Sequence, residues 1–274
     1  MTRRKRWAVI GGAAAVLGVA SLAVARQQET APGAVPPAAG GKAAAAPRVD
    51  PKANELLKRM SDYLSGLQTF SFVAEHATEV VLQSGEKLEF LADSNVMVQR
   101  PNHLRSDRRG EKANVSLYYD GKSVTIYGHR MNMYAMAAAP PTLDAAIDFT
   151  RKQLNVEAPA ADLLYAAPYP ILMEDVVSGT YVGEAVVDGA KCHHLAFRGN
   201  ETDWQVWIED GARPLPRRYV IVSKKVVGTP EFQVELRAWN LSPQVTPEMF
   251  VFRPPPGSER IDFVGAAKAA RQAR

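Results

Sequence analysis

The spacing of apolar residues predicts a leading helix, then two sets of strands with a helical segment between them. After Asp50 the apolar residues recur every three or four positions, which is typical of one amphipathic helix. Asp50 can cap this helix, Pro51 suits its first turn and Gly66 marks its end. The apolar stripe consists of Leu57, Met60, Leu64 and Leu67.

From Phe70 onward the apolar period falls to two, the period of a β-strand. Phe70 and Phe72 share one face of the first predicted strand, whereas Glu75 takes the other. Asp-Gly pairs are strong hairpin signals, and they lie at 120–121, 188–189 and 210–211. Alternation also predicts strands that include 103–107, 131–136, 218–227 and 231–238, with a short last strand around 250–252.

Between the two sets of strands, the chain has the signals of helices. Thr142 can cap a helix whose first turn holds Asp144 and whose last turn holds Arg151 and Lys152, charges that suit the helix dipole. With ten or eleven strands, we expect an α+β, mainly β fold. Its form would be an open, incomplete antiparallel β-barrel with an N-terminal helix and a helical insertion, about 142–177, acting as a lid.

The first 25 residues have the anatomy of a bacterial export signal. A basic head, with four cations between Arg3 and Arg6, precedes an uncharged run from Trp7 that closes on small residues at 23–25. We therefore expect cleavage after Ala25 and a periplasmic protein. An uncleaved membrane anchor is the alternative, because the run of 19 residues approaches the roughly 20 of a spanning helix.

The same segment accounts for the net charge of the chain. There are 33 Lys and Arg against 29 Asp and Glu, and removing the four signal cations leaves 29 against 29. A near-neutral protein lacks the global basic surface that nucleic acid requires, so we expect no nucleic-acid partner.

Composition divides the remainder of the chain into three parts. Residues 26–49 are rich in Ala, Pro and Gly, which predicts a disordered linker. Residues 50–265 form the predicted domain, and 266–274 a C-terminal tail. A lone cysteine, Cys192, excludes an intramolecular disulfide. We interpret it as a buried thiol, with intermolecular pairing as the alternative.

Two sequence segments of the predicted domain carry a family resemblance. The hairpin Tyr118-Tyr-Asp-Gly-Lys-Ser-Val-Thr-Ile-Tyr127 and the closing segment Pro247-Glu-Met-Phe-Val-Phe-Arg-Pro-Pro-Pro-Gly257 resemble the LolA/LolB-like superfamily of lipoprotein and lipid carriers. Together with the segment 203–216, the domain more closely resembles a family of exported bacterial proteins of unknown function. The resemblance implies a half-barrel with an apolar cavity for acyl chains, and it assigns no activity and no individual ligand contact.

Catalytic and metal-binding motifs are not found in the sequence. It has no Gly-x-Ser-x-Gly elbow, no His-Glu-x-x-His and no phosphate-binding glycine loop. His193 and His194 are adjacent in a predicted strand, so they face opposite sides and do not form one ligand set. Glu209 and Asp210 end a strand at a turn, where Asp before Gly is turn chemistry. We expect no enzyme, no catalytic residue, no cofactor and no metal.

Two groups of residues allow a second interpretation. Met131 and Met133, with His129 upstream, would share one face if 131–136 is a strand, which suits Cu(I). We favour a soft apolar lining instead, because methionine adapts to varied ligands. The basic residues Arg100, Arg105, Arg108, Arg109 and Lys112 are interpreted as a solvated sheet edge. Contact with anionic head groups or an acidic partner is their alternative.

These observations predict a periplasmic binding or carrier protein that holds an apolar ligand, a lipid or lipoprotein acyl chain, in the concave face of a curved sheet. An envelope protein-interaction or regulatory module without a cavity is the alternative. We expect membrane contact to be transient, unless the signal is retained. The candidate cavity residues are Phe70, Phe72, Leu88, Phe90, Val96, Met131, Met133, Trp204 and Val206.

Overall fold

The computed structural model describes residues 49–263, in which one continuous twelve-stranded sheet carries helices on its inner side. The first six strands are β1 (Thr69–Val81), β2 (Lys87–Gln99), β3 (His103–Gly110), β4 (Asn114–Tyr119), β5 (Ser123–Gly128) and β6 (Met133–Ala138). The other six are β7 (Val176–Val187), β8 (Ala190–Gly199), β9 (Thr202–Glu209), β10 (Pro216–Ser223), β11 (Glu231–Asn240) and β12 (Glu259–Ile261).

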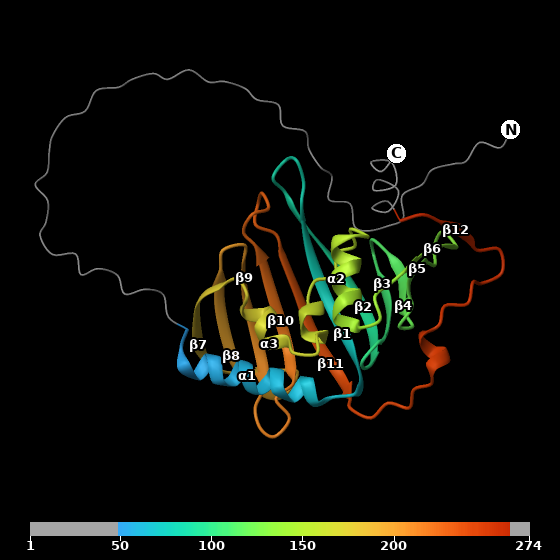
Figure 1. Cartoon of the computed structure of the whole chain (residues 1–274). Helices are drawn as coiled ribbons and strands as arrows, with labels where there is room; N and C mark the ends of the chain where they lie inside the picture. The colour runs from blue at the N-terminus through green and yellow to red at the C-terminus, as the bar shows by residue number, and fades with distance from the viewer. Residues whose placement is uncertain (1–48, 264–274) are drawn as a thin grey trace, which may run out of the picture.

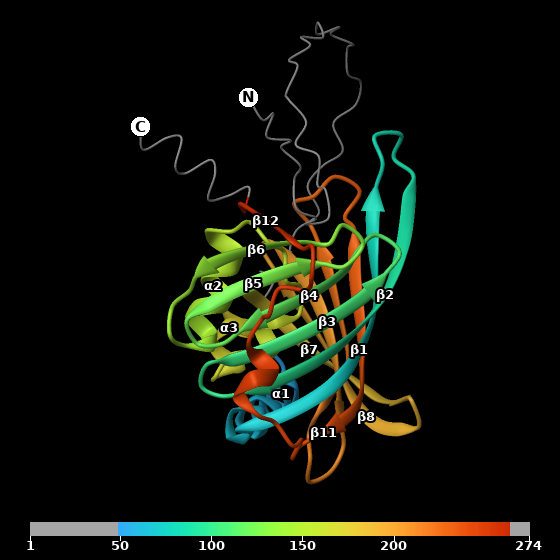
Figure 2. The same cartoon turned by 90° about the vertical axis from the view of Figure 1, so that its right-hand side faces the viewer.

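Strand order makes this sheet open. It runs β12-β6-β5-β4-β3-β2-β1-β11-β10-β9-β8-β7, and all neighbours are antiparallel except β12 and β6. Two meanders, β1 to β6 and β7 to β11, meet where β1 pairs with β11. The edge strands β7 and β12 do not pair with each other. Figures 1 and 2 show the sheet curving around the helices, which confirms the predicted half-barrel.

One predicted strand is wrong. The segment around 250–252 does not form a strand; η2, a single 3₁₀ turn at Pro247–Phe250, comes first, and β12 follows several residues later. Proline has no N–H to donate to a strand ladder. Pro247 and the three prolines at 254–256 flank the segment, so it crosses the sheet instead of joining it.

The leading helix α1 (Pro51–Gly66) forms as its sequence predicts. The Asp50 carboxylate accepts hydrogen bonds from the backbone N–H groups of Lys52, at 2.7 Å, and Ala53, at 3.2 Å. These two bonds satisfy donors that a helix start leaves unpaired. The buried stripe includes Leu57, Met60 and Leu64. Figure 1 shows α1 along the lower edge of the sheet.

The segment between β6 and β7 contains α2 (Leu143–Lys152), η1 (Ala161–Leu164) and α3 (Pro168–Met173). Thr142 caps α2, since its hydroxyl accepts from the Ala145 N–H at 3.4 Å. We call this segment, 142–175, the helical insertion. It lies in front of the sheet in Figure 1, on the concave face, which is the face that carries Phe70 and Leu104.

Arg100 fixes the helical insertion to the rest of the domain. Its guanidinium donates to the carbonyls of Leu164 and Tyr165, each at 2.9 Å, and of Leu67 at 3.1 Å. Burial lowers the pKa of Arg100, yet guanidinium stays charged in proteins. Three carbonyl acceptors around one partly buried cation join the end of α1 and the end of η1 to Arg100, which directly follows β2.

The C-terminal segment crosses the opposite, convex face of the sheet (Figure 2). The Phe252 ring contacts the rings of Tyr118, Tyr127 and Tyr134, with centroids 5.4, 5.5 and 5.0 Å away. These tyrosines lie on β4, β5 and β6. One phenylalanine therefore fastens the segment across three strands.

The predicted signal (1–25), nearly all of the linker (26–49) and the tail (266–274) lie outside the described residues. Within 49–263, no helix is both long enough and apolar enough to span a membrane.

Candidate functional site

A cavity of about 500 Å³ lies between the helical insertion and the concave face of β8, β9 and β10. Its helical side and its sheet side both contribute aromatic and charged residues. The lining residues are Asp148, Arg151, Lys152, Asp162, Tyr165, Ile171, Leu172, Glu174, Asp175, Gly199, Thr202, Trp204 and Tyr219.

Aromatic rings form the sheet side of this cavity. Phe197 on β8 stacks on Trp204 of β9, with centroids 4.1 Å apart, and Trp204 meets Tyr219 of β10 edge to face at 5.7 Å. Phe197 and Trp204 lie opposite each other in the strand register. Burial raises the pKa of the Tyr219 hydroxyl, and Asp162 raises it further. The floor of the cavity therefore carries the aromatic side chains of Trp204 and Tyr219, and the Tyr219 phenol is neutral.

Charged residues of the helical insertion form the other side. Arg151 Nη1 donates to Asp162 Oδ1 at 2.8 Å, and the Tyr165 hydroxyl donates to Asp148 Oδ1 at 2.8 Å. Lys152 donates to the second oxygen of Asp148 at 3.0 Å. The bonds from Tyr165 and then Lys152 lower the pKa of Asp148. Both cations are paired, so this side orders the insertion and offers a polar boundary to a ligand.

Five of the nine candidate cavity residues lie in one buried cluster. Phe70, Phe72, Val96, Trp204 and Val206 all face the concave side and are at most 9 % exposed. Of these five, only Trp204 lines the cavity. The other four are buried in one cluster with residues of the helices, so in this structure they form part of a packed core.

The other four candidates are not brought to the cavity. Leu88 and Phe90 are half-buried on the part of β2 near the hairpin tip. Met131 lies in a turn, not on a strand, because β6 begins at Met133. The predicted shared face of His129, Met131 and Met133 is therefore wrong.

His129 also has its own hydrogen-bond partner. Its Nε2 lies 2.8 Å from the hydroxyl of Ser116, which donates to Asp107 Oδ1 at 2.5 Å. Among the described residues no group of three or more His, Cys, Asp or Glu side chains is arranged to hold a metal ion.

The side chains of His193 and His194 do not lie together, and neither do those of Glu209 and Asp210, as the alternation of a strand requires. His193 lies 3.2 Å from both the Tyr181 hydroxyl and Asp210, whereas His194 stacks on Trp207 at 4.0 Å. Glu209 pairs with Arg217 instead of converging with Asp210. The free thiol of Cys192 is 1 % exposed, and burial raises its pKa, which confirms the prediction of a buried cysteine.

The interpretation of the basic residues as a sheet edge is wrong. β3 lies between β2 and β4, inside the sheet. Arg105 pairs with Asp107 on the convex face, at 2.8 Å, whereas Arg108 faces the concave side. The basic residues look contiguous in the sequence, but the pleat sends neighbours to opposite faces.

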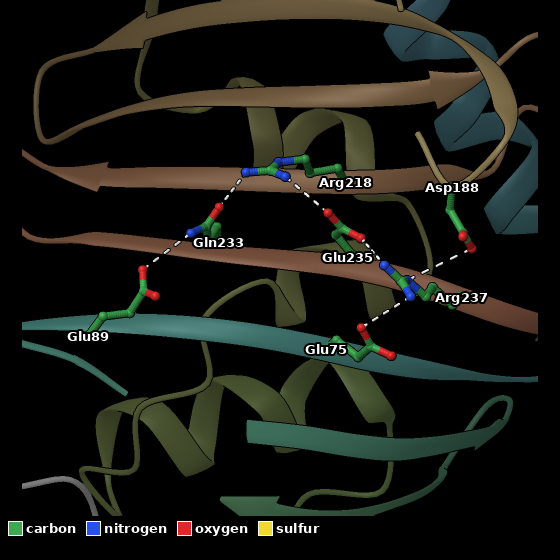
Figure 3. Close-up of polar contacts among 7 residues, drawn as sticks. All are labelled: Glu75, Glu89, Asp188, Arg218, Gln233, Glu235 and Arg237. Atoms are coloured by element: carbon green, nitrogen blue, oxygen red, sulfur yellow. Dashed lines mark hydrogen bonds and ion pairs between the residues drawn. The ribbon is translucent and has the colours of Figure 1, made fainter. Parts of the chain in front are cut away.

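The convex face carries a large charged network, drawn in Figure 3. Arg237 on β11 lies 3.3 Å from Glu75 and 3.8 Å from Asp188, and it also pairs with Glu235. Glu235 in turn accepts from Arg218 at 3.0 Å. Arginines alternate with carboxylates along this network, which stabilises the sheet surface. It holds four carboxylates, Glu75, Glu89, Asp188 and Glu235, against two arginines, so its excess charge is negative.

Sequence reasoning missed several residues that line the cavity. The sequence pattern indicates Arg151 only as a helix-end charge, and it does not mark Asp162, Tyr165 or Tyr219 as site residues. Tyr219 lies in an almost continuous apolar run, in which alternation does not assign a face. The one sequence feature that points to these residues is the predicted helical insertion. A lid must place some of its side chains toward the sheet, so residues of the insertion were candidates for the cavity lining.

Comparison with known proteins places this chain in a family. Residues 53–264 match the model of the family described as predicted periplasmic protein (DUF2092), and the chain belongs to that family. This confirms the resemblance to an exported bacterial family. No curated protein matches the chain.

Three solved structures are similar to this one. An uncharacterized conserved protein from Thermus thermophilus is 16 % identical, covers 77 % of this chain and 99 % of its own, and has a TM-score of 0.44. The lipoprotein LppX from Mycobacterium tuberculosis is 13 % identical, with 72 % and 100 % covered and a TM-score of 0.42. A LolA superfamily protein from Nitrosomonas europaea is 8 % identical, with 73 % and 97 % covered and a TM-score of 0.38.

Proposed function

We propose that this protein is a periplasmic, non-enzymatic carrier that holds an apolar or amphiphilic ligand, a lipid or a lipoprotein acyl chain, against the concave face of its sheet. The observation that carries the proposal is the cavity between the helical insertion and the rings of Trp204 and Tyr219. The candidate residues deeper in the core support the fold of the site, and the ligand lies outside them.

The size and lining of the cavity support this function. A volume of about 500 Å³ falls within the roughly 300–1,000 Å³ of small-molecule sites. At about 25 cal/mol per Å², burial of about 200 Å² of acyl chain contributes about 5 kcal/mol. The rings of Trp204 and Tyr219 supply part of such a surface, and the polar residues of the helical insertion face the part of a ligand that stays near water.

The helical insertion is the proposed lid. Two hydrogen-bonded contacts, Arg151 to Asp162 and Tyr165 to Asp148, hold its pieces together, and both are partly exposed. Partly exposed ion pairs contribute little to stability, so parting them costs little. Arg100 anchors the insertion near Leu164 and Tyr165 and would serve as the fixed end of the movement.

The family description and the N-terminal sequence support the compartment. A signal of residues 1–25 would be cleaved after Ala25, and a linker of 26–49 would join it to the domain of 50–265. Membrane contact would then be transient, at the moments of ligand loading and release.

Native mass spectrometry of the protein purified from a periplasm, followed by lipid extraction, tests the proposal. We expect a stoichiometric lipid or acyl adduct and a gain in thermal stability when oleate is added to the delipidated protein. A mass without adduct, together with no stabilisation by oleate or phospholipid, would overturn it.

A pair of variants then locates the ligand. Thr202 lines the cavity on β9, whereas Thr180 lies on β7 outside the cavity. Thr202→Trp places an indole in the cavity and should weaken oleate binding at least tenfold. Thr180→Trp adds the same indole outside the cavity and should leave Kd unchanged. Equal effects of the two substitutions would place the ligand elsewhere.

A protein-interaction module is the second candidate function, and the edge strand β7 favours it. In the described part of the chain, β7 pairs with β8 on one side, and only an isolated bridge from Val49 to Gly179 touches its other side. Val182 and Val186 are 53 % and 70 % exposed there. A free apolar edge can accept a strand from another protein. Backbone amide exchange along β7 that slows on adding envelope extract would support this function.

A further inference from the structure

Three polar side chains, those of His76, Ser94 and Arg108, lie together on the mostly apolar concave face. Arg108 on β3 pairs in register with Ser94 on β2, and Ser94 pairs with Ala74 on β1. His76, two residues beyond Ala74, has its Nε2 3.2 Å from the Ser94 hydroxyl. Ser94 is buried and the other two are partly buried. Alternation puts all three on the face that carries Phe72 and Leu104.

Two of these side chains have buried nitrogens without a partner. Within residues 49–263, Arg108 Nε and His76 Nδ1 are shielded from solvent and make no hydrogen bond. Arg218 and Arg237 have a similar Nε, but other nitrogens of both are paired with carboxylates. Arg108 forms no ion pair with a carboxylate of the described residues. A partly buried, unpaired guanidinium is costly, so this group is suited to receive an anion.

His76 adds a donor and no charge. Burial lowers its pKa to about 4, with Arg108 contributing to the shift, so its imidazole is neutral in the periplasmic pH range. When the Ser94 hydroxyl donates to Nε2, the proton of the neutral ring resides on Nδ1. His76 Nδ1–H and the Arg108 guanidinium then both offer N–H groups.

The surroundings select the kind of anion. The Phe232 ring lies 5.7 Å from the His76 ring, and Val234 occupies the register position next to His76. Val234 also lies opposite Tyr219, which lines the cavity. At about 4.8 Å per strand, His76 is about 10 Å across the sheet from Tyr219. The side chain between them, Val234, is apolar and 3 % exposed, so a long acyl chain would cross that distance where the helical insertion, the proposed lid, lifts from the sheet.

We propose that Arg108, assisted by His76 and Ser94, binds the anionic head group, a carboxylate or a phosphate, of an amphiphile whose chain extends along the concave face toward Trp204 and Tyr219. The proposal rests on the proposed carrier function and adds that the ligand is negatively charged. The neighbouring Arg109 faces the convex side and is exposed, so it offers a control that removes the same charge outside the site.

Binding of three matched amphiphiles tests the proposal: oleate, oleyl phosphate and the neutral oleyl alcohol, each measured with the wild-type protein and with Arg108→Gln and Arg109→Gln. We expect Arg108→Gln to weaken oleate and oleyl phosphate at least tenfold and oleyl alcohol less than twofold. Arg109→Gln should leave all three unchanged. A larger loss for phosphate than for carboxylate identifies a phospholipid-like head group, and the reverse identifies a fatty acid.

Three results would overturn the proposal. If Arg108→Gln binds both anions as tightly as the wild-type protein does, Arg108 does not bind the head group. The same conclusion follows if Arg108→Gln weakens oleyl alcohol as much as the anions. Either result is compatible with the carrier function. Failure of the wild-type protein to bind any of the three amphiphiles removes the carrier function as well. We also expect inorganic phosphate to compete with oleyl phosphate and not with oleyl alcohol.

A measurement on the wild-type protein makes the test independent of how the variants fold. The carboxyl carbon of bound ¹³C-labelled oleate reports its own titration by NMR. Beside Arg108 the pKa of that carboxyl should fall below its value in water, whereas an apolar site without a cation would raise it. A raised pKa would contradict the proposal.

Discussion

Arg151, at the end of α2, donates to the carboxylate of Asp162 in η1 at 2.8 Å, and this ion pair connects two parts of the helical insertion at the side of the cavity. Arg151 also donates to the carbonyl of Ala158 at 2.6 Å. The helices of the insertion are short, so side-chain hydrogen bonds such as these two largely hold its segments in place.

Loss of this pair should loosen the insertion without unfolding the sheet. We expect Arg151→Gln to cost about 1 kcal/mol, because it removes two partly buried hydrogen bonds. Amide exchange should accelerate across 158–175 and remain unchanged in β1. Lys152→Gln is the control, since Lys152 is 69 % exposed and its pair with Asp148 is on the surface. Equal acceleration in both variants would contradict the prediction.

The partly buried histidine His76 predicts a specific loss of stability in acid. Its pKa is about 4 in the folded protein and 6.5 without burial, so between these pH values the unfolded chain binds a proton that the folded chain does not. Stability therefore falls as pH drops from 6.5 to 4, by up to about 3 kcal/mol from this group. Urea unfolding at about pH 7 and about pH 4.5 should show a smaller drop for His76→Asn than for the wild-type protein. An equal drop would show that other groups account for the acid sensitivity.

Phe252 should hold the C-terminal segment on the convex face. Its ring is 9 % exposed among three tyrosines. We expect Phe252→Ala to cost about 3 kcal/mol by large-to-small truncation. Proteolysis near 240–256 should also become faster. Val251→Ala serves as the control, because Val251 is 40 % exposed and should change stability little. A Phe252→Ala protein as stable as the control would contradict this role.

The charged network of the convex face should contribute in a salt-dependent way. Arg237 contacts Glu75, Asp188 and Glu235, and its side chain is 38 % exposed. We expect Arg237→Gln to lower the melting temperature at low ionic strength and to have a much smaller effect in about 1 M NaCl, because salt screens exposed charges. Lys225→Gln, which removes a single exposed pair with Glu201 at 4.0 Å, should have no measurable effect in either buffer. An Arg237→Gln effect that persists in high salt would point to packing instead of charge.

Much of the fold follows from local sequence. The cap at Asp50, the cap at Thr142 and the alternation that begins at Phe70 each predict an element that the structure contains. The short last strand was misplaced, because prolines around 250–252 interrupt pairing that alternation alone would allow. Local patterns also predicted that His193 and His194 would face opposite sides, and the structure confirms it.

The site was less predictable than the fold. An inward apolar residue can line a cavity or fill a core, and the sequence pattern is the same for both. Phe70 and Val206 are filled core, whereas Trp204 on the same face borders the cavity. That difference depends on where the helical insertion ends over the sheet.

The sequence by itself determined the capped helices, most of the strands and, where apolar and polar residues alternate, the face that a strand residue occupies, because these depend on neighbours a few residues apart. Only the tertiary structure decided which concave positions remain uncovered, and which charges lack a partner. Both depend on contacts between distant segments, as when the insertion at 142–175 packs over β8 to β10, or when Arg108 faces β1 and β2 without a carboxylate of the described residues beside it. Packing volume and charge pairing are properties of the assembled fold, and no local period encodes them.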